Sequence, residues 1–259
     1  MATTRYMALG ARTMLVAAVF LAGACAASAD VFHMEPGLTS LEFVPVGNPG
    51  NAADTPKFGC GAVAYEYNIG KFEVTAAQYA AFLNAVAATD AYGLYNTQMD
   101  ATANPFGCNI LRTGSPGGYA YTVAPDYANR PVNYVSFWDA ARFANWLHNG
   151  QPTGAQDAGT TERGAYTLDG YNADGGWTIQ RAADAKYAVT SGDEWYKAAY
   201  HKNDGVTGNY WDYPTGSDTA PGRDMADASG NNANYYAGSG AYPIDSGKYT
   251  TVAGEFQNS

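Results

Sequence analysis

Only three short stretches of this sequence repeat their apolar residues with the period of a helix, and this scarcity limits the fold most strongly. The stretches follow Thr75, Ser136 and Ser191, each of which can cap the first amides of a helix. Between them the chain is rich in glycine, asparagine, proline and tyrosine and has little periodicity. The sequence therefore predicts a domain with few regular elements and long, ordered loops.

The first helix is predicted over about residues 76–87 and the second from Ser136 to His148, where His148-Asn149-Gly150 forms the C-cap. Thr75 and Gln78 make a capping box before the first helix. Its apolar face comprises Tyr79, Phe82, Leu83 and Val86. The face of the second comprises Ala140, Phe143, Ala144 and Leu147. Both helices are expected to pack into the core.

The third helix is predicted to start at Thr190 or Ser191, where residues 191–194 read as a capping box. It is expected to end at residues 202–205, which contain Asn203, Asp204 and Gly205. Its buried side is expected to consist of Trp195, Ala198 and Ala199.

Alternation of apolar and polar residues predicts early strands in residues 41–47 and 62–70, and a short hairpin strand at 119–123. Residues 92–127 otherwise form a long loop region that tyrosine side chains hold in place. No internal repeat or interdomain linker is visible, and the length suits one domain of the larger sort.

Composition excludes two classes of protein. The aromatic content of 14% is too high for a disordered chain. The formal net charge of −10 repels phosphate backbones, so we do not expect nucleic acid as a partner.

The N-terminus has the three parts of a secretory signal. Arg5 and Arg12 precede an apolar run at residues 14–22, and Ala27-Ser28-Ala29 forms a small-residue cleavage site. The run is shorter than the roughly 20 residues that cross a bilayer, so no membrane span is expected. We therefore predict a signal peptide at residues 1–29, a single domain at 30–259, and a periplasmic, secreted or cell-surface location.

Two cysteines, Cys60 and Cys108, remain after the predicted cleavage. In an oxidising compartment they can form one disulfide, and two free buried thiols are the equally weighted alternative. The sequence contains no H-E-x-x-H or C-x-x-C spacing, so a zinc or iron site built from histidine and cysteine is not expected. It also lacks a G-x-S-x-G elbow and a glycine-rich phosphate loop.

Two kinds of segment are candidates for binding. The turns at residues 172–175 and 231–234 offer carboxylate and amide oxygens of the kind that calcium takes, although ordinary turn chemistry explains them equally well. Tyr210, Trp211 and Tyr213 could line a groove for a sugar or a peptide, or could belong to the core.

Read together, the three helices and their flanks resemble the formylglycine-generating enzyme family, also called sulfatase-modifying factors. The resemblance rests on residues 69–82, on residues 130–140 with Trp146, and on residues 190–199. Tyr213-Pro214 and Ala233-Asn234 continue the order of the family's signposts, and the likeness extends over residues 41–256. Residues 129–136 and 145–152 are most similar to a bacterial exported subgroup whose biochemical role is unassigned.

The resemblance implies an irregular α+β fold related to C-type lectins, low in regular secondary structure, with bound calcium. It implies that Asn234 and the carbonyl of Tyr235 are calcium ligands, with Asp245 a looser candidate for the same site. Family enzymes oxidise a cysteine of a target sulfatase, using copper bound to a catalytic cysteine pair.

The family's G-N-V-W-E-W and R-G-G-S-W blocks do not occur in residues 1–259. We therefore expect the domain to be incomplete at its C-terminus and not catalytic as written, and we do not expect it to bind copper. Three functions are considered: an exported domain of unassigned activity, a calcium-dependent module that binds a glycan or protein, and a fragment of an active copper-dependent oxidase.

Overall fold

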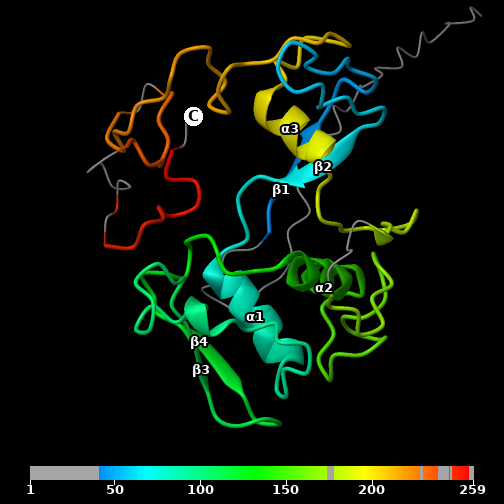
Figure 1. Ribbon diagram of the computed structural model, residues 1–259, viewed down its shortest axis with the longest axis vertical. Coiled ribbons are helices and arrows are strands. Elements are labelled where there is room, and N and C mark those ends of the chain that lie inside the picture. The colour runs from blue at the N-terminus through cyan, green and yellow to red at the C-terminus, as the bar shows by residue number, and fades with distance from the viewer. Residues whose placement is uncertain (1–40, 174–177, 228–229, 239–244, 246, 257–259) are drawn as a thin grey trace, which may run out of the picture.

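The computed structural model describes residues 41–173, 178–227, 230–238, 245 and 247–256. Its elements are short and widely spaced (Figure 1): β1 (Phe43–Val46), β2 (Tyr67–Gly70), α1 (Ala76–Val86), η1 (Thr97–Met99), β3 (Ile110–Thr113), β4 (Ala120–Val123), α2 (Phe137–His148) and α3 (Gly192–Tyr200). The expected α+β fold with little regular structure is confirmed. The predicted signal peptide lies outside the described residues.

All three predicted helices are present, and each begins with a complete capping box. Thr75 pairs with Gln78 before α1, Ser136 with Asp139 before α2, and Ser191 with Glu194 before α3. In each box the side chain of the cap accepts the N3 amide, while the N3 side chain accepts the amide of the cap. Local chemistry therefore fixes where the helices start.

The buried side of α3 differs from the prediction. Trp195 is 52% exposed and Ala198 is exposed, whereas the buried residues of α3 are Glu194, Tyr196 and Lys197. The polar face is inward because distant loops provide partners for it. Lys197 Nζ, for example, donates to the carbonyl of Asn48 at 2.9 Å. Paired in this way, charged side chains can be buried.

The strands form two separate antiparallel pairs. β1 pairs with β2 and lies beside α3, and β3 pairs with β4 and lies beside α1 (Figure 1). The predicted strand segments contain β1, β2 and β4, while β3 was not predicted.

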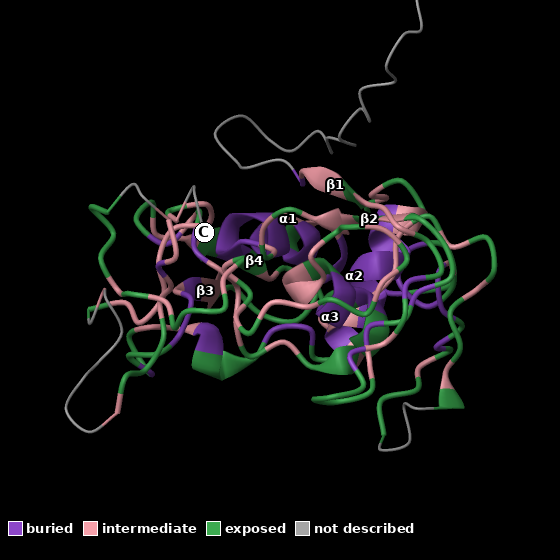
Figure 2. Cartoon of the chain, turned by 90° about the horizontal axis from the view of Figure 1, so that it is seen from above, coloured by how far each residue is buried: buried purple, intermediate pink, exposed green. Residues whose placement is uncertain are grey.

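The main core lies where α1 and α2 meet beside β3 and β4. Phe82 of α1 contacts Phe143 and Trp146 of α2, with ring centroids 5.3 Å apart in both pairs. A smaller cluster joins Ala141 and Ala144 of α2 to Ala165, Tyr166 and Leu168. Buried residues accordingly follow the helices, while the loops around them are mostly exposed (Figure 2).

Cys60 and Cys108 are not paired in the structure, and of the two only Cys108 is buried, whereas the second alternative expected both thiols to be buried. Cys108 is buried in the main core with α1 and β3, while the main-chain carbonyl of Cys60 accepts the amide of Asp54 in a loop. The adjacent Gly61 amide donates to Asp193 of α3. The two cysteines therefore lie in different parts of the fold. Within the described residues, no helix combines the length and apolar character needed to cross a membrane.

Candidate functional site

The segment that leads into α2 carries an arginine that ties the C-terminal part of the chain to the helical core. Arg130 is only 8% exposed. Its Nε donates to the carbonyl of Asp126 at 2.9 Å, its Nη2 to the carboxylate of Asp245 at 2.7 Å, and its Nη1 to the carbonyl of Thr250. One side chain thus fixes the position of the turn that includes Asp245 and residues 247–250.

Two tyrosines near this arginine have a backbone conformation that is unusual for bulky side chains. The φ angle is 58° at Tyr134 and 63° at Tyr249. The left-handed region costs an L-residue roughly 1–2 kcal/mol, and strain of this kind gathers at functional sites. Tyr134 is nevertheless 38% exposed, so burial of the ring does not account for the strain.

Polar contacts join the segments that carry Tyr134 and Phe106, and Phe106 in turn contacts Tyr249. Asn104 Nδ2 donates to the hydroxyl of Tyr134 at 2.7 Å, and Asn133 Nδ2 donates to the carbonyl of Phe106 at 2.6 Å. The Phe106 ring is 50% exposed and lies 4.4 Å, centroid to centroid, from that of Tyr249. We call Phe106, Tyr134 and Tyr249 the Tyr134 surface.

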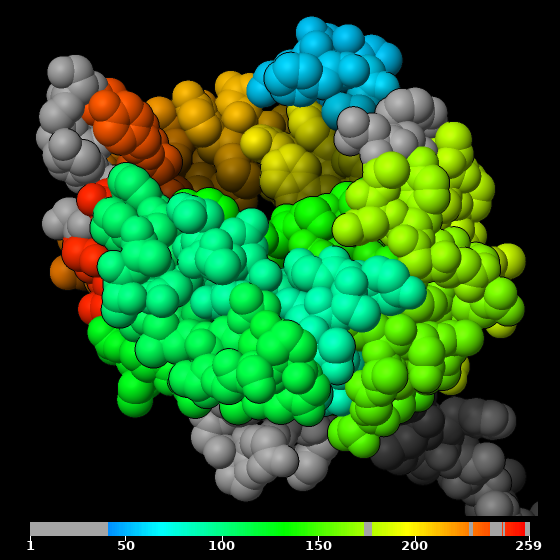
Figure 3. All heavy atoms as spheres, turned by 60° about the horizontal axis from the view of Figure 1, so that its bottom comes forward, coloured from blue at the N-terminus to red at the C-terminus, as the bar shows by residue number. Residues whose placement is uncertain are grey.

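The Tyr134 surface lies where three distant parts of the chain meet. In Figure 3 the teal-green segment that includes residues 97–107 lies against red C-terminal residues on one side. On its other side the face is hollowed, with green and yellow segments bordering the hollow (Figure 3). The sequence did not reveal this surface, because its three aromatic residues lie in segments that are far apart in the chain.

The structure brings two of the predicted calcium ligands to the same turn. Asn234 Nδ2 donates to the carbonyl of Tyr249 at 3.3 Å, and the carbonyl of Asp245 accepts the amide of Tyr249 at 2.6 Å. Tyr235 follows Asn234, and its hydroxyl donates to the carbonyl of Pro221 at 2.9 Å. Amide, carbonyl and carboxylate oxygens are ligand types that fit calcium.

Arg130 bears on any cation at this turn. It occupies one oxygen of the Asp245 carboxylate, and the other oxygen has no hydrogen-bond partner in the described residues. Among the described residues, no group of three or more histidine, cysteine, aspartate or glutamate side chains is placed to hold a metal ion. A cation would therefore depend on amide and main-chain oxygens for most of its ligands. The second candidate turn, 172–175, extends beyond the described residues at Asp174.

The predicted groove residues have three different surroundings. The hydroxyl of Tyr210 donates to the carbonyls of Ala52 and Gly61, at 2.9 and 3.0 Å, so it anchors a loop. The ring of Trp211 is covered by Lys202, whose Nζ lies 4.1 Å from the ring centroid. Tyr213 is half-buried and its amide donates to the carbonyl of Ser217 at 3.0 Å.

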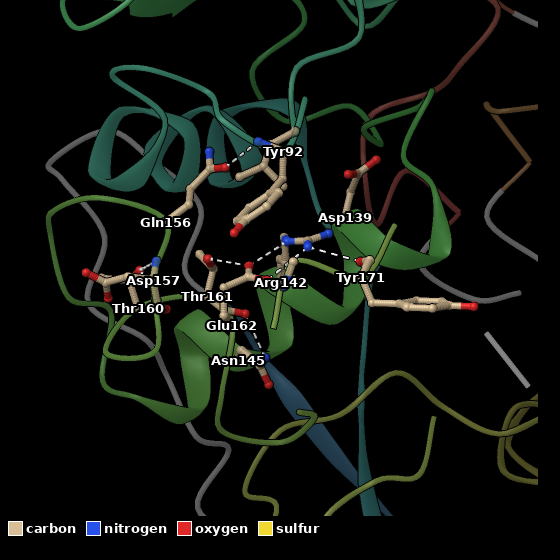
Figure 4. A network of polar contacts seen from close by, with 12 residues as sticks. Tyr92, Asp139, Arg142, Asn145, Gln156, Asp157, Thr160, Thr161, Glu162 and Tyr171 are labelled. Carbon is tan, nitrogen blue, oxygen red and sulfur yellow. Dashed lines mark hydrogen bonds and ion pairs between the residues drawn. The ribbon is translucent and has the colours of Figure 1, made fainter. Parts of the chain in front are cut away.

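A buried ion pair joins α2 to the loop that contains Glu162 (Figure 4). Arg142 is fully buried, and its Nε and Nη2 donate to the two carboxylate oxygens of Glu162 at 2.7 and 3.0 Å. The ring of Tyr92 lies 4.4 Å from the guanidinium carbon. Asn145, also on α2, donates to the carbonyls of Thr161 and Tyr166. This network fixes the loop at residues 155–171 on the helix that follows Tyr134.

Residues 50–259 match the family described as the sulfatase-modifying factor enzyme 1-like domain. The chain belongs to this family. No curated protein and no solved structure was found to match it. The matched range includes Arg130, α2, α3 and the whole Tyr134 surface, so all of these features lie within the sulfatase-modifying factor domain of this chain.

The described cysteines of this sulfatase-modifying factor domain do not fit a copper site. Cys108 is buried in the main core. The pKa of its thiol is raised, because the effect of burial is larger than the opposing effect of main-chain hydrogen bonds. Thiolate is the form that binds metal. Cys60 belongs to the loop packed on α3, so the two sulfur atoms do not converge on one site.

Proposed function

We propose that the chain is an exported sulfatase-modifying-factor-like domain that binds a glycan through the Tyr134 surface. The observation that carries the proposal is the strained and exposed Tyr134, which Asn104 joins to the half-exposed Phe106. Flat aromatic rings stack on the apolar faces of sugars. Asn104 holds the hydroxyl of Tyr134 and Asn133 holds the main chain at Phe106, so this surface loses less conformational entropy when a ligand binds than a mobile loop would.

Binding is favoured over oxidation because the described residues supply a fixed aromatic surface but no cysteine pair. Both thiols are free and belong to different parts of the fold. Export is part of the proposal and rests on the signal-like residues 1–29. Copper-dependent oxygen uptake with a cysteine-containing peptide would contradict the binding function.

Replacing Tyr134 by glycine is expected to abolish glycan binding while leaving the fold stable. Glycine accepts a φ of 58° without strain, which offsets the lost hydrogen bond from Asn104. The thermal midpoint is therefore expected to change by only a few degrees, corresponding to about 1 kcal/mol. Binding is measured on a glycan array and the midpoint by circular dichroism.

The matched control for this experiment is Phe58→Ala. Phe58 is 74% exposed but contacts Tyr196 of α3, away from the Tyr134 surface. The Phe58→Ala variant should bind the array like the native protein, whereas the Phe106→Ala variant should lose binding. If the native protein binds no glycan, or if Tyr134→Gly binds normally, the proposed function is wrong.

Calcium is proposed to support this surface through Asn234, Asp245 and the carbonyl of Tyr235. Adding calcium at 100 times its dissociation constant should then stabilise the protein by about 2.7 kcal/mol, because the ion binds only the folded state. In Asp245→Asn the stabilisation should be largely lost, since the carboxylate that attracts the ion is gone. The measurement is the thermal midpoint with calcium and with chelator.

Asp126→Asn is the control for the calcium experiment. Asp126 pairs with Lys248 at 3.3 Å, so it contacts the same turn without being a candidate ligand. Because Asp245→Asn also weakens the contact with Arg130, the calcium-dependent increment is compared and not the absolute midpoint. An equal increment in both variants would exclude Asp245 as a ligand.

A further inference from the structure

His201 caps the end of α3 and closes the hairpin loop that follows the helix. Its Nδ1 accepts the main-chain amide of Asn203, and its Nε2 lies against the carbonyl of Thr207, both at 3.1 Å. A carbonyl can only accept, so Nε2 must bear the hydrogen. Together the two contacts are satisfied by one form alone, the neutral ring protonated at Nε2.

Protonation of His201 at Nδ1 would disrupt the contact with Asn203. A second hydrogen on Nδ1 would face the N–H of Asn203, so an attractive contact would become a repulsive one. Histidine is the side chain that ordinarily changes its charge between pH 5 and 8. The loop at residues 203–209 is therefore matched to neutral histidine.

Among the charged groups near the ring, the carboxylate of Asp204 would attract a protonated His201. Asp204 interacts electrostatically with His201, while its carboxylate now accepts Asn209 Nδ2 at 2.8 Å. Lys202 is directed to Asp218, with its Nζ 3.0 Å from the carboxylate. The other face of the ring meets the uncharged ring of Tyr210, 5.0 Å away. An attraction to Asp204 would draw the protonated ring away from the Asn203 amide.

The contact at Asn203 is linked to a second loop. Asn48 Nδ2 donates to Asn203 Oδ1 at 2.7 Å, and the carbonyl of Asn48 in turn accepts the buried Lys197. Asn203 and Asn48 both have left-handed backbones, with φ of 54° and 53°. A change at His201 is thus passed through Asn203 to the loop that covers the polar face of α3.

We propose that His201 is a pH-sensitive latch that holds the 203–209 loop closed at neutral pH and releases it in acid. The latch is formed by the two main-chain contacts of the neutral ring. Release loosens the hold of Asn203 on Asn48 and leaves the core around α1 and α2 intact. It is independent of the glycan proposed for the Tyr134 surface.

Amide hydrogen exchange at Asn203 tests the latch directly. Its protection factor in the full chain is compared at about pH 7.5 and pH 5, with the Ala87 amide in the core as a reference. We expect the protection at Asn203 to fall about ten-fold or more at the lower pH, because a hydrogen on Nδ1 removes the acceptor of the Asn203 amide. The protection at Ala87 should stay constant.

Two substitutions decide the origin of the change. In His201→Asn the side-chain oxygen replaces Nδ1 as acceptor for the residue two positions on and does not titrate, so protection should be independent of pH. His148→Asn alters the other histidine of the described chain, whose Nδ1 accepts the Lys186 amide, and should leave the response of Asn203 unchanged. Equal protection of native Asn203 at both pH values, or a drop that persists in His201→Asn, would overturn the proposal.

Discussion

Replacing Glu162 by glutamine is expected to lower the free energy of unfolding by about 3–5 kcal/mol, because it leaves a buried arginine without its counter-charge. Arg142 and Glu162 have exposed side-chain fractions of 0% and 4%. Nη1 of Arg142 already lacks a hydrogen-bond partner in the described part of the chain. Asp139 also interacts electrostatically with Arg142, but Glu162 is the carboxylate that the guanidinium contacts and on which its charge balance mainly depends.

The carboxylate of Glu162 has further partners that glutamine would serve less well. It accepts the hydroxyl of Thr161 at 3.0 Å and the amide of Gly170 at 2.7 Å. An amide side chain has one oxygen in place of two, and its NH₂ group would face either the arginine or one of these donors. The loop at residues 155–171 should consequently loosen first.

Urea unfolding of the native protein and the variant measures the effect. Asp169→Asn is the matched control, since it breaks the Arg163–Asp169 pair, whose side chains are 60% and 50% exposed. Exposed pairs contribute little, so no clear change is expected there. A double variant, Arg142→Met with Glu162→Leu, should recover much of the lost stability. A Glu162→Gln protein as stable as the native one would show that the pair does not hold the loop.

The parts of this fold that the sequence predicts are those determined by neighbours in the chain. All three capping boxes lie within four consecutive residues, and all three are present. The inward side of α3 depends instead on Tyr65, Arg181 and Asn48, which reach it from distant loops. A period of apolar residues could not reveal that Glu194 and Lys197 would be buried in place of Trp195.

The Tyr134 surface could not be predicted for a related reason. Tyrosine gives no sign in the sequence that its φ will be positive, as glycine or asparagine would. The contact of Phe106 with Tyr249 joins segments far apart in the chain. The calcium candidates came from the family resemblance, and the structure adds the role of Arg130, which already holds the Asp245 carboxylate.

Glu194 should make the stability of the protein depend on pH in the acid range. Its side chain is 4% exposed. Burial by itself raises the pKa of Glu194, but hydrogen bonds from Arg181, Tyr65 and the Ser191 amide outweigh it and hold the pKa at about 2, below the ordinary 4.5. A carboxyl whose pKa is lowered by folding stabilises the folded state above the unfolded-state pKa. That contribution is lost as the pH falls from 4.5 toward 2.

Glu194→Gln is therefore expected to cost about 3 kcal/mol at pH 7, and the cost should shrink steadily below about pH 4.5. The neutral amide keeps the shape of the side chain but loses the charge that Arg181 requires, at 2.8 Å from Oε1. Urea unfolding of the two proteins between pH 7 and pH 3 gives the difference at each pH. Glu73→Gln, at an exposed position before α1, should differ little from the native protein throughout. A difference for Glu194→Gln that stays constant with pH would mean that the side chain acts through packing and capping alone.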